Sequence, residues 1–434
     1  MENETFETTC CVVGGGPAGI MFAYLIARAG VPVIVLEKHA DFFRDFRGDT
    51  VHPSTLEVMY ELGLLEDLLK IPHQRVQEAG GRFGNFEFQA GDFRRLPVHS
   101  KFIALMPQWD FLNFLSERAK QCPTFRLLMQ HEAIELTKEG ERITGVVARG
   151  PGGEVVSIRA QLVVGCDGRH SVVRKAAQLE LVEFGAPIDV LWFRISRWPD
   201  DPPQVLGNAN YGKFLVLINR GDYFQAGMVI RKGSFEEHKS RGLEHFRGSL
   251  RLIAPYLGER VEEIRDWELI KLLTVRLDRL RRWYRPGLLC VGDAAHAMSP
   301  VGGVGINLAV QDAVAAANIL SRPLRNGRVT DHSLALVQRR REFPVRLTQA
   351  AQARIHDGLV RIFRNPGPLA APWQLKVAMR IPGIHFALGY AIGVGVRPEH
   401  VGGARRRSPA WCPLAFAIGA AVAVMALLRK PKVA

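Results

Sequence analysis

The N-terminal pattern of apolar and polar residues predicts a β-turn-α-β unit of about 30 residues. A short β-rich run at 8–13 leads into a glycine-rich turn, and apolar residues at helical spacing then continue to about Ala29. Gly30 ends this helix, and the continuous apolar run 31–36 is typical of a strand that is buried on both faces. The chain therefore begins like a parallel α/β sheet.

The middle of the chain has a different texture of short segments in which apolar and polar positions alternate. It begins at about residue 71 as a Gly- and Phe-rich stretch and resumes at about residue 183, continuing to about 277. Alternation of this kind predicts antiparallel strands with one buried face. The clearest of these strands are 190–196, 214–219 and 223–231.

The remaining segments return to α/β and helical patterns. A buried strand is expected at 288–292, a small-residue helix at 304–320, and a charged helix at 331–363 with a kink at Pro344. Further elements expected nearer the N-terminus are helices at 56–69 and 110–120 and a hairpin formed by 133–148 and 154–164.

These patterns predict an α/β fold, in which a Rossmann-like nucleotide-binding domain carries an inserted antiparallel β-sheet domain and C-terminal helices. A chain of 434 residues is long enough for two domains. The first domain is expected at 1–75, 100–182 and 278–330, the inserted domain at 76–99 and 183–277, and a helical region at 331–404.

Charge and cysteine usage narrow the class of protein. The formal net charge is +14, but no nucleic-acid-binding motif accompanies it, so anionic lipids and anionic cofactors are the favoured partners and no nucleic acid is expected. None of the six cysteines has the spacing of a metal site, and we expect reduced thiols and no metal. The acidic N-terminus has no apolar core of a signal peptide, which predicts a cytoplasmic body.

The C-terminal tail predicts a membrane anchor. Residues 410–428 carry no charge, and as a helix they would span about 28 Å, close to the thickness of a bilayer's hydrocarbon core. No acidic residue follows Glu399, whereas six basic residues flank the apolar stretch. A single-pass anchor is the favoured interpretation, and a helix docked on the body or in a homodimer contact is the alternative.

The first motif is the turn Gly14-x-Gly16-x-x-Gly19 between the first strand and the first helix. Its glycines allow a tight turn, close approach of a pyrophosphate, and close packing of helix on strand. The helix N-terminus adds free N–H groups for phosphate. Glu37 lies 18 residues past Gly19, where its carboxylate can accept hydrogen bonds from ribose hydroxyls. Ala18 and Lys38 belong to the same candidate cofactor site.

Two further motifs follow strand-like runs. In the second, Asp167-Gly168 makes a turn, and taken alone it is more simply explained as the cap of the helix that begins near Ser171. In the third, Gly292-Asp293 is followed by a loop containing Pro300 and then by a helix. Glycines there would let a flat ring lie against the backbone, and the helix N-terminus favours negative charge on that ring. Gly303, Gly305, Ile306 and Asn307 follow in this loop and at the start of the helix.

The three motifs, in this order and spacing, resemble the class A flavoprotein monooxygenases of the para-hydroxybenzoate hydroxylase type over about residues 8–400. The resemblance implies FAD as cofactor, with Asp167-Gly168 near its pyrophosphate and Gly292-Asp293 on its ribityl chain. It also implies that Arg47 contacts FAD phosphate and the nicotinamide donor, and that Gln108 lies beside the ribityl chain. NADH or NADPH would bind transiently, which agrees with the lack of a second GxGxxG turn.

The resemblance further implies that NAD(P)H reduces FAD and that reduced FAD reacts with O2 to give a C4a-hydroperoxide, which hydroxylates an electron-rich ring. The loop containing Pro300 and the residues Gly303, Gly305, Ile306 and Asn307 would border the flavin ring. We expect substrate contacts from the inserted sheet, although each candidate is individually also explained as an ordinary strand residue. The candidates are Trp192, Arg194, Tyr223, Gln225, Met228 and Arg231. His296 and His52 are candidate bases, and for His296 a structural role is favoured.

A membrane anchor favours a lipophilic aromatic or polycyclic substrate over a water-soluble acid. Two alternatives stay open from the sequence. One is a flavin reductase of the geranylgeranyl reductase type, which saturates double bonds without oxygen, and the other is a non-catalytic membrane flavoprotein. Oxygen consumption that depends on substrate would distinguish the monooxygenase from both.

Overall fold

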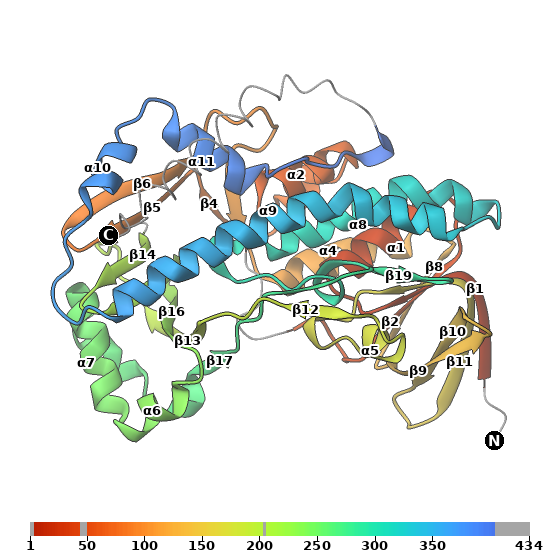
Figure 1. Cartoon of the computed structure of the whole chain (residues 1–434), viewed down its shortest axis with the longest axis horizontal. Helices are drawn as coiled ribbons and strands as arrows, with labels where there is room; N and C mark the ends of the chain where they lie inside the picture. Colours follow the sequence, from red (N-terminus) through yellow and green to blue (C-terminus); the bar gives the residue numbers. More distant parts are fainter. Residues whose placement is uncertain (1–3, 44–49, 203–204, 404–434) are drawn as a thin grey trace, which may run out of the picture.

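A computed structural model describes residues 4–43, 50–202 and 205–403 (Figure 1). Two of the features predicted from the sequence, Arg47 and the apolar tail 410–428, lie outside these residues. The α/β fold class is confirmed: one sheet is mainly parallel, a second is almost entirely antiparallel, and long helices lie across the C-terminal half.

The mainly parallel sheet has the strand order β19-β20-β11-β1-β2-β8, with β10 and β9 added antiparallel beside β11. Its centre is β1 (Glu4–Val13), which pairs in parallel with β2 (Val33–Glu37) and β11 (Val155–Gly165). The second half of β1 and all of β2 are buried, as the continuous apolar runs predict. The other strands are β8 (Phe125–Met129), β9 (Glu132–Glu139), β10 (Arg142–Arg149), β19 (Tyr284–Arg285) and β20 (Leu288–Cys290).

Two local predictions were wrong in this part of the chain. The segment 133–148 is not one strand but the hairpin of β9 and β10, which turns at Gly140 with a positive φ of 57°. The helix expected at 56–69 is divided into α2 (Pro53–Glu61) and α3 (Leu65–Leu68). Gly63 between them has a φ of 73°, a left-handed conformation that ends a helix.

The second sheet, called here the inserted sheet, has the order β17-β13-β16-β15-β14-β5-β6. All neighbours are antiparallel except β14 and β5, which pair in parallel. Strands from two distant stretches of sequence therefore share one sheet. They are β5 (Glu78–Phe83), β6 (Phe86–Asp92), β13 (Ile188–Ser196), β14 (Val205–Asn210), β15 (Lys213–Asn219), β16 (Tyr223–Arg231) and β17 (Lys271–Leu273).

Alternation along the inserted sheet gives it two apolar faces. Leu191, Phe193 and Met228 pack on one face with Phe246 of α7 (Leu243–Ile253). Trp192 and Val229 belong to the other face, which packs with residues of β7 (Ile103–Leu105), α9 (Asp331–Phe363) and α11 (Ile384–Gly393). The sequence did not predict α7 or α6 (Phe235–Ser240), because this stretch was interpreted as continuing strands.

Long helices connect the two sheets. α9 (Asp331–Phe363) contacts α8 (Gly305–Arg325) and β19 at the parallel sheet, and β15 at the inserted sheet (Figure 1). A capping box formed by Thr330 and Ser333 fixes its start, and the helix continues through Pro344. The remaining α-helices and β-strands of the described residues are α1 (Pro17–Arg28), α4 (Gln108–Lys120), α5 (Val172–Ala176), α10 (Trp373–Ala378), α11 (Ile384–Gly393), β3 (Thr50–Val51), β4 (Gln74–Val76), β7 (Ile103–Leu105), β12 (Leu181–Glu183) and β18 (Asp278–Leu280).

Within the described residues, one helical stretch is long and apolar enough to cross a membrane, at Val301–Arg325. Two thirds of its most apolar window is buried inside the protein. Packing of α8 against α1 and α9 therefore accounts for its apolar sequence.

Candidate functional site

The glycine-rich turn after β1 is built by contacts that exclude side chains at two of its glycines. Gly14 has a φ of 105°, and a Cβ there would lie 2.5 Å from the carbonyl oxygen of Cys166. A Cβ on Gly19 would lie 2.0 Å from the carbonyl oxygen of Gly14. Gly16, the N-cap of α1, has nothing within 4 Å of the position of a Cβ. The turn is thus closed against the protein and open where a phosphate would approach the helix N-terminus.

Glu37 joins this turn to the end of β2. Its carboxylate is 8% exposed, accepts a hydrogen bond from the Gly15 backbone N–H at 2.9 Å, and accepts another from the His39 N–H at 3.1 Å. The carboxylate therefore lies against the glycine turn, where ribose binding is expected. Lys38 is exposed beside it, and Ala18 is buried in the first turn of α1.

Asp167 caps the helix that follows the second motif. Its carboxylate accepts hydrogen bonds from the Ser171 hydroxyl at 2.5 Å and from the backbone N–H groups of Val172 and Val173. Burial raises the pKa of Asp167, and these hydrogen bonds oppose that rise. The motif thus shapes the start of α5, and its predicted contact with FAD stays a prediction. Arg169, which follows Gly168, lies 3.6 Å from the Asp293 carboxylate of the third motif.

The third motif meets the first at a close contact between small residues. A Cβ on Gly292 would lie 3.1 Å from the Cβ of Ala18 and 3.4 Å from that of Ala309 in α8. Gly292 also has a φ of 60°, which favours glycine. The Gly292-Asp293 turn, α1 and α8 therefore converge, although 274 residues separate Ala18 from Gly292 (292 minus 18).

The loop after Pro300 forms the approach to α8. Gly302 and Gly303 both have positive φ, and the Gly303 carbonyl accepts a hydrogen bond from the Thr50 hydroxyl at 2.8 Å. Nothing lies within 4 Å of a Cβ position on Gly305, the first residue of α8. The backbone is therefore open at a second helix N-terminus. Ile306 is buried directly after it.

Asn307 and His52 form a buried polar pair at the same loop. The Asn307 Oδ1 atom accepts hydrogen bonds from the His52 backbone N–H at 3.0 Å and from the Thr55 hydroxyl at 2.6 Å. The His52 Nδ1 atom lies 2.8 Å from the carbonyl oxygen of Ile392 in α11. Among the described residues, Asn307 Nδ2 and His52 Nε2 are buried without a partner. Buried polar atoms of this kind are rare unless a ligand or water satisfies them.

These features fit FAD. Open glycines at two helix N-termini suit its pyrophosphate and the negative edge of its ring, and the unpartnered polar atoms suit a ring that bears both donors and acceptors. When bound, FAD supplies the redox chemistry, and the chain supplies position and exclusion of water. Gln108 is half-buried at the first position of α4, and Pro300 is half-buried at the start of the loop.

Some residues that build the site were not predicted from the sequence. The contacts of Thr50, His52 and Thr55 with the loop 303–307 connect segments about 250 residues apart. Asp312 in α8 and Arg341 in α9 form a buried ion pair beside His296. Of these residues, only His52 and His296 were candidates from the sequence, as possible bases. The helical pattern of 304–320 does not indicate whether the Asp312 side chain is buried or exposed.

The substrate candidates on the inserted sheet are distributed over both faces. Trp192 and Gln225 are 9% and 5% exposed, and the Trp192 ring lies against Gly227 of the neighbouring strand. Met228 is on the opposite face, against α7, so it does not share a surface with Trp192. Arg194, Tyr223 and Arg231 lie toward strand ends, where both arginine side chains are more than 60% exposed.

Arg194 is paired at the surface rather than enclosed. It lies 3.4 Å from Asp222, and its guanidinium lies over the Tyr223 ring. Exposed ion pairs contribute about 0–1 kcal/mol, so we expect Arg194→Ala to change kcat/KM less than about fivefold. Steady-state turnover checks this, with Trp192→Phe on the same strand as the control that should have the larger effect. A larger loss in Arg194→Ala than in Trp192→Phe would restore Arg194 as a substrate contact.

Comparison with known proteins agrees with this geometry. The sequence model of a family described as FAD binding domain matches residues 7–351. The chain is 34% identical over 387 residues to a 6-methylpretetramide 4-monooxygenase of Streptomyces rimosus, covering 86% of this chain and 89% of that protein.

Solved structures share the fold at lower identity. PqsL, described as a probable FAD-dependent monooxygenase from Pseudomonas aeruginosa, superimposes with a TM-score of 0.70 at 21% identity, covering 83% of this chain and 99% of that one. OxyS, an anhydrotetracycline hydroxylase from Streptomyces rimosus, gives 0.69 at 22% identity, covering 90% and 77%. The family match and the 34% identity show that this chain is a member of the class A FAD-dependent aromatic monooxygenases.

Proposed function

We propose that the protein hydroxylates an electron-rich ring of a lipophilic polycyclic aromatic substrate, using NADH or NADPH and O2. One observation carries the choice of substrate class. The face of the inserted sheet that bears Trp192 shares an apolar cluster with Leu105 of β7 and with Val301. Val301 belongs to the loop 300–304 before α8, called here the flavin loop because the flavin ring is expected to lie against it. Apolar side chains packed beside the flavin loop suit a flat, multi-ring substrate better than a small charged one.

The relatives support the same class. The names of 6-methylpretetramide 4-monooxygenase and anhydrotetracycline hydroxylase refer to polycyclic aromatic compounds. In this chain, Leu359 and Ile362 of α9 and Tyr390 of α11 extend the apolar cluster around the same face. These side chains would lie against the rings and exclude water from the flavin loop, which limits side reactions at the flavin.

The test is anaerobic reduction of bound FAD by NADH and NADPH, with and without a panel of phenols and polycyclic aromatic ligands. We expect slow reduction by the donor alone and reduction at least about tenfold faster with a polycyclic ligand, since positioning effects of this size are common. Under 18O2 the product should gain one labelled oxygen atom. A reduction rate that is the same with every ligand, or a hydrogenated product without labelled oxygen, would support a flavin reductase of the geranylgeranyl reductase type instead.

Membrane attachment is a separate proposal that rests on the sequence. Residues 410–428 are uncharged and flanked by basic residues, and an anchor there would place the enzyme beside a lipophilic substrate. Full-length protein should sediment with anionic vesicles, and protein lacking 410–434 should stay in the supernatant. Equal partitioning of the two would exclude the anchor.

A further inference from the structure

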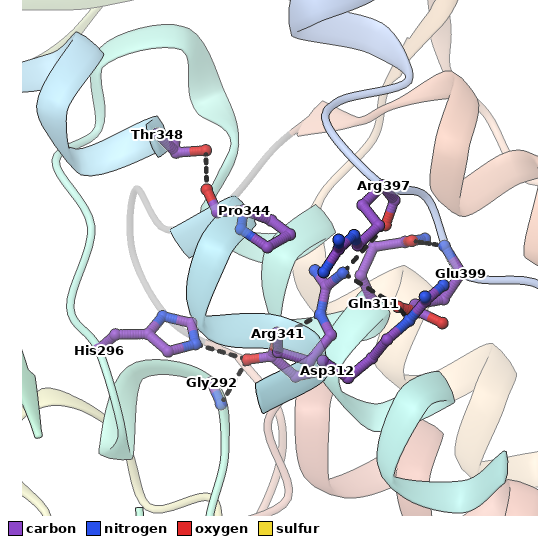
Figure 2. A network of polar contacts seen from close by, with 10 residues as sticks. Gly292, His296, Gln311, Asp312, Arg341, Pro344, Thr348, Arg397 and Glu399 are labelled. Carbon is purple, nitrogen blue, oxygen red and sulfur yellow. Dashed lines mark hydrogen bonds and ion pairs between the residues drawn. The ribbon is translucent and has the colours of Figure 1, made fainter. Parts of the chain in front are cut away.

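A buried charge network contacts Gly292 of the Gly292-Asp293 turn (Figure 2). Its centre is the Asp312 carboxylate, which is fully buried in α8. One oxygen, Oδ2, accepts hydrogen bonds from the Gly292 backbone N–H at 3.2 Å and from His296 Nε2 at 2.6 Å. The other, Oδ1, accepts a hydrogen bond from Arg341 Nε at 2.9 Å. Asp312 therefore holds the turn directly through a backbone N–H.

Arg341 connects Asp312 to the end of the described chain. Its side chain is 1% exposed, and its Nη1 atom donates to the carbonyl oxygen of Arg397 at 3.2 Å and to the Glu399 carboxylate at 3.3 Å. Arg340 donates to the same carboxylate at 2.7 Å. Figure 2 shows the side chains meeting in line between His296 and Glu399. The backbone N–H of Glu399 donates back to Gln311, the neighbour of Asp312.

The charges of Asp312, Arg341 and Glu399 depend on one another because all three side chains are buried. Burial alone would raise the pKa of Asp312, but the neighbouring His296 and Arg341 outweigh it and hold that pKa below its usual value. Asp312 is thus a carboxylate, which can accept from Gly292, His296 and Arg341 together. Without Glu399, the buried Arg341 would lose a counter-charge and would be free to draw Asp312 away from the turn.

We infer that Asp312, Arg341 and Glu399 are positioning residues for FAD, in which Glu399 fixes Arg341, Arg341 fixes Asp312, and Asp312 fixes the Gly292-Asp293 turn. FAD binding and formation of the Arg341–Glu399 contact are then linked, and each must strengthen the other to the same extent. Glu399 and Arg397 lie beyond the residues 7–351 that match the family. The inference requires only FAD binding and not the hydroxylation proposed above.

The test compares two carboxylates that hold the same segment. Glu399→Gln keeps the size of the side chain and removes its charge. Glu61→Gln is the matched control, since Glu61 accepts hydrogen bonds from His400 and from the Val401 N–H but has no contact with Arg341 or Asp312. We expect Glu399→Gln to weaken FAD binding about tenfold and Glu61→Gln to leave it within twofold, as measured by reconstitution of apoprotein.

Hydrogen exchange gives the reciprocal readout. In the wild-type protein, FAD should slow exchange of the backbone amides at 397–401, and in Glu399→Gln this protection should be lost. A purely structural role would lower the melting temperature of apoprotein and holoprotein equally and leave the dissociation constant of FAD unchanged. That result, or an equal loss of FAD affinity in both variants, would overturn the inference.

Discussion

Gly16→Val is expected to remove FAD binding while leaving the apoprotein folded. Gly16 has extended backbone angles, φ −73° and ψ −177°, which valine also adopts. Nothing lies within 4 Å of its Cβ position, so the protein leaves space for a side chain there. The valine side chain would occupy the space over the N-terminus of α1, where the pyrophosphate is expected to lie.

The expected size of the effect follows from that geometry. Valine is a poorer N-cap than glycine, so the apoprotein should lose about 1 kcal/mol of stability. FAD affinity should fall by more than about 100-fold, because a branched side chain blocks both the close approach of phosphate and its hydrogen bonds with the backbone. Flavin fluorescence during titration of apoprotein measures the affinity, and circular dichroism on heating measures the fold.

Gly14→Val is the contrasting variant, two residues away. A Cβ at this position would lie 2.5 Å from the Cys166 carbonyl oxygen, and valine does not adopt a φ of 105° without strain. This variant should fail to fold, with or without FAD. If Gly16→Val retained wild-type affinity, the pyrophosphate could not lie over this helix end, and the cofactor site would have to be placed elsewhere.

The glycine turn is an example of a feature that a local sequence pattern predicts well. The spacing of Gly14, Gly16 and Gly19 between a strand and a helix is local, and so it predicted the turn and the fold class correctly. The prediction failed where a short helical pattern lies inside a region of alternating strands. The stretch 235–253 forms α6 and α7, whose apolar residues Phe246, Leu250 and Ile253 follow helical spacing within a region that otherwise alternates.

Contacts between distant segments could not be predicted from the sequence for a different reason. His52 precedes Pro53, and its local sequence indicates only the N-cap of a helix. Its hydrogen-bond partners Asn307 and Ile392, however, are 255 and 340 residues away. Asp312 likewise appears in a run of small residues, and only the arrangement of α8 and α9 brings Arg341 to it. Single-sequence patterns carry no information on such pairs, and these pairs shape the loop where FAD is expected to bind.

His52 should make the protein sensitive to acid. Burial lowers the pKa of its imidazole from 6.5 to about 4, while the neighbouring backbone carbonyls of Ile392 and Gly303 oppose that shift. A carbonyl only accepts, so the Nδ1–H donates to Ile392 and Nε2 carries no proton. The neutral ring therefore links α11 to the start of α2, whose backbone is in turn bonded to Asn307.

The direction of the pH effect follows from the two states. Below pH 6.5 His52 is protonated in the unfolded chain, whereas in the folded protein it stays neutral down to about pH 4. The free energy of unfolding must then fall as the pH falls through this window, by about 2 kcal/mol at pH 5 and about 3 kcal/mol at pH 4. Above pH 6.5 both states are neutral at this position, and His52 contributes no pH dependence.

His52→Asn tests this expectation. Asparagine is a good N-cap and keeps an N–H donor for the Ile392 carbonyl, but it does not titrate. Denaturant unfolding of apoprotein at pH 7 and pH 5 should show a loss about 2 kcal/mol smaller in His52→Asn than in the wild-type protein. His332→Asn, at an exposed position of α9, should retain the wild-type loss. Equal losses in all three proteins would mean that His52 is already charged in the folded state, and that the carbonyls of Gly303 and Ile392 hold an imidazolium between the flavin loop and α11.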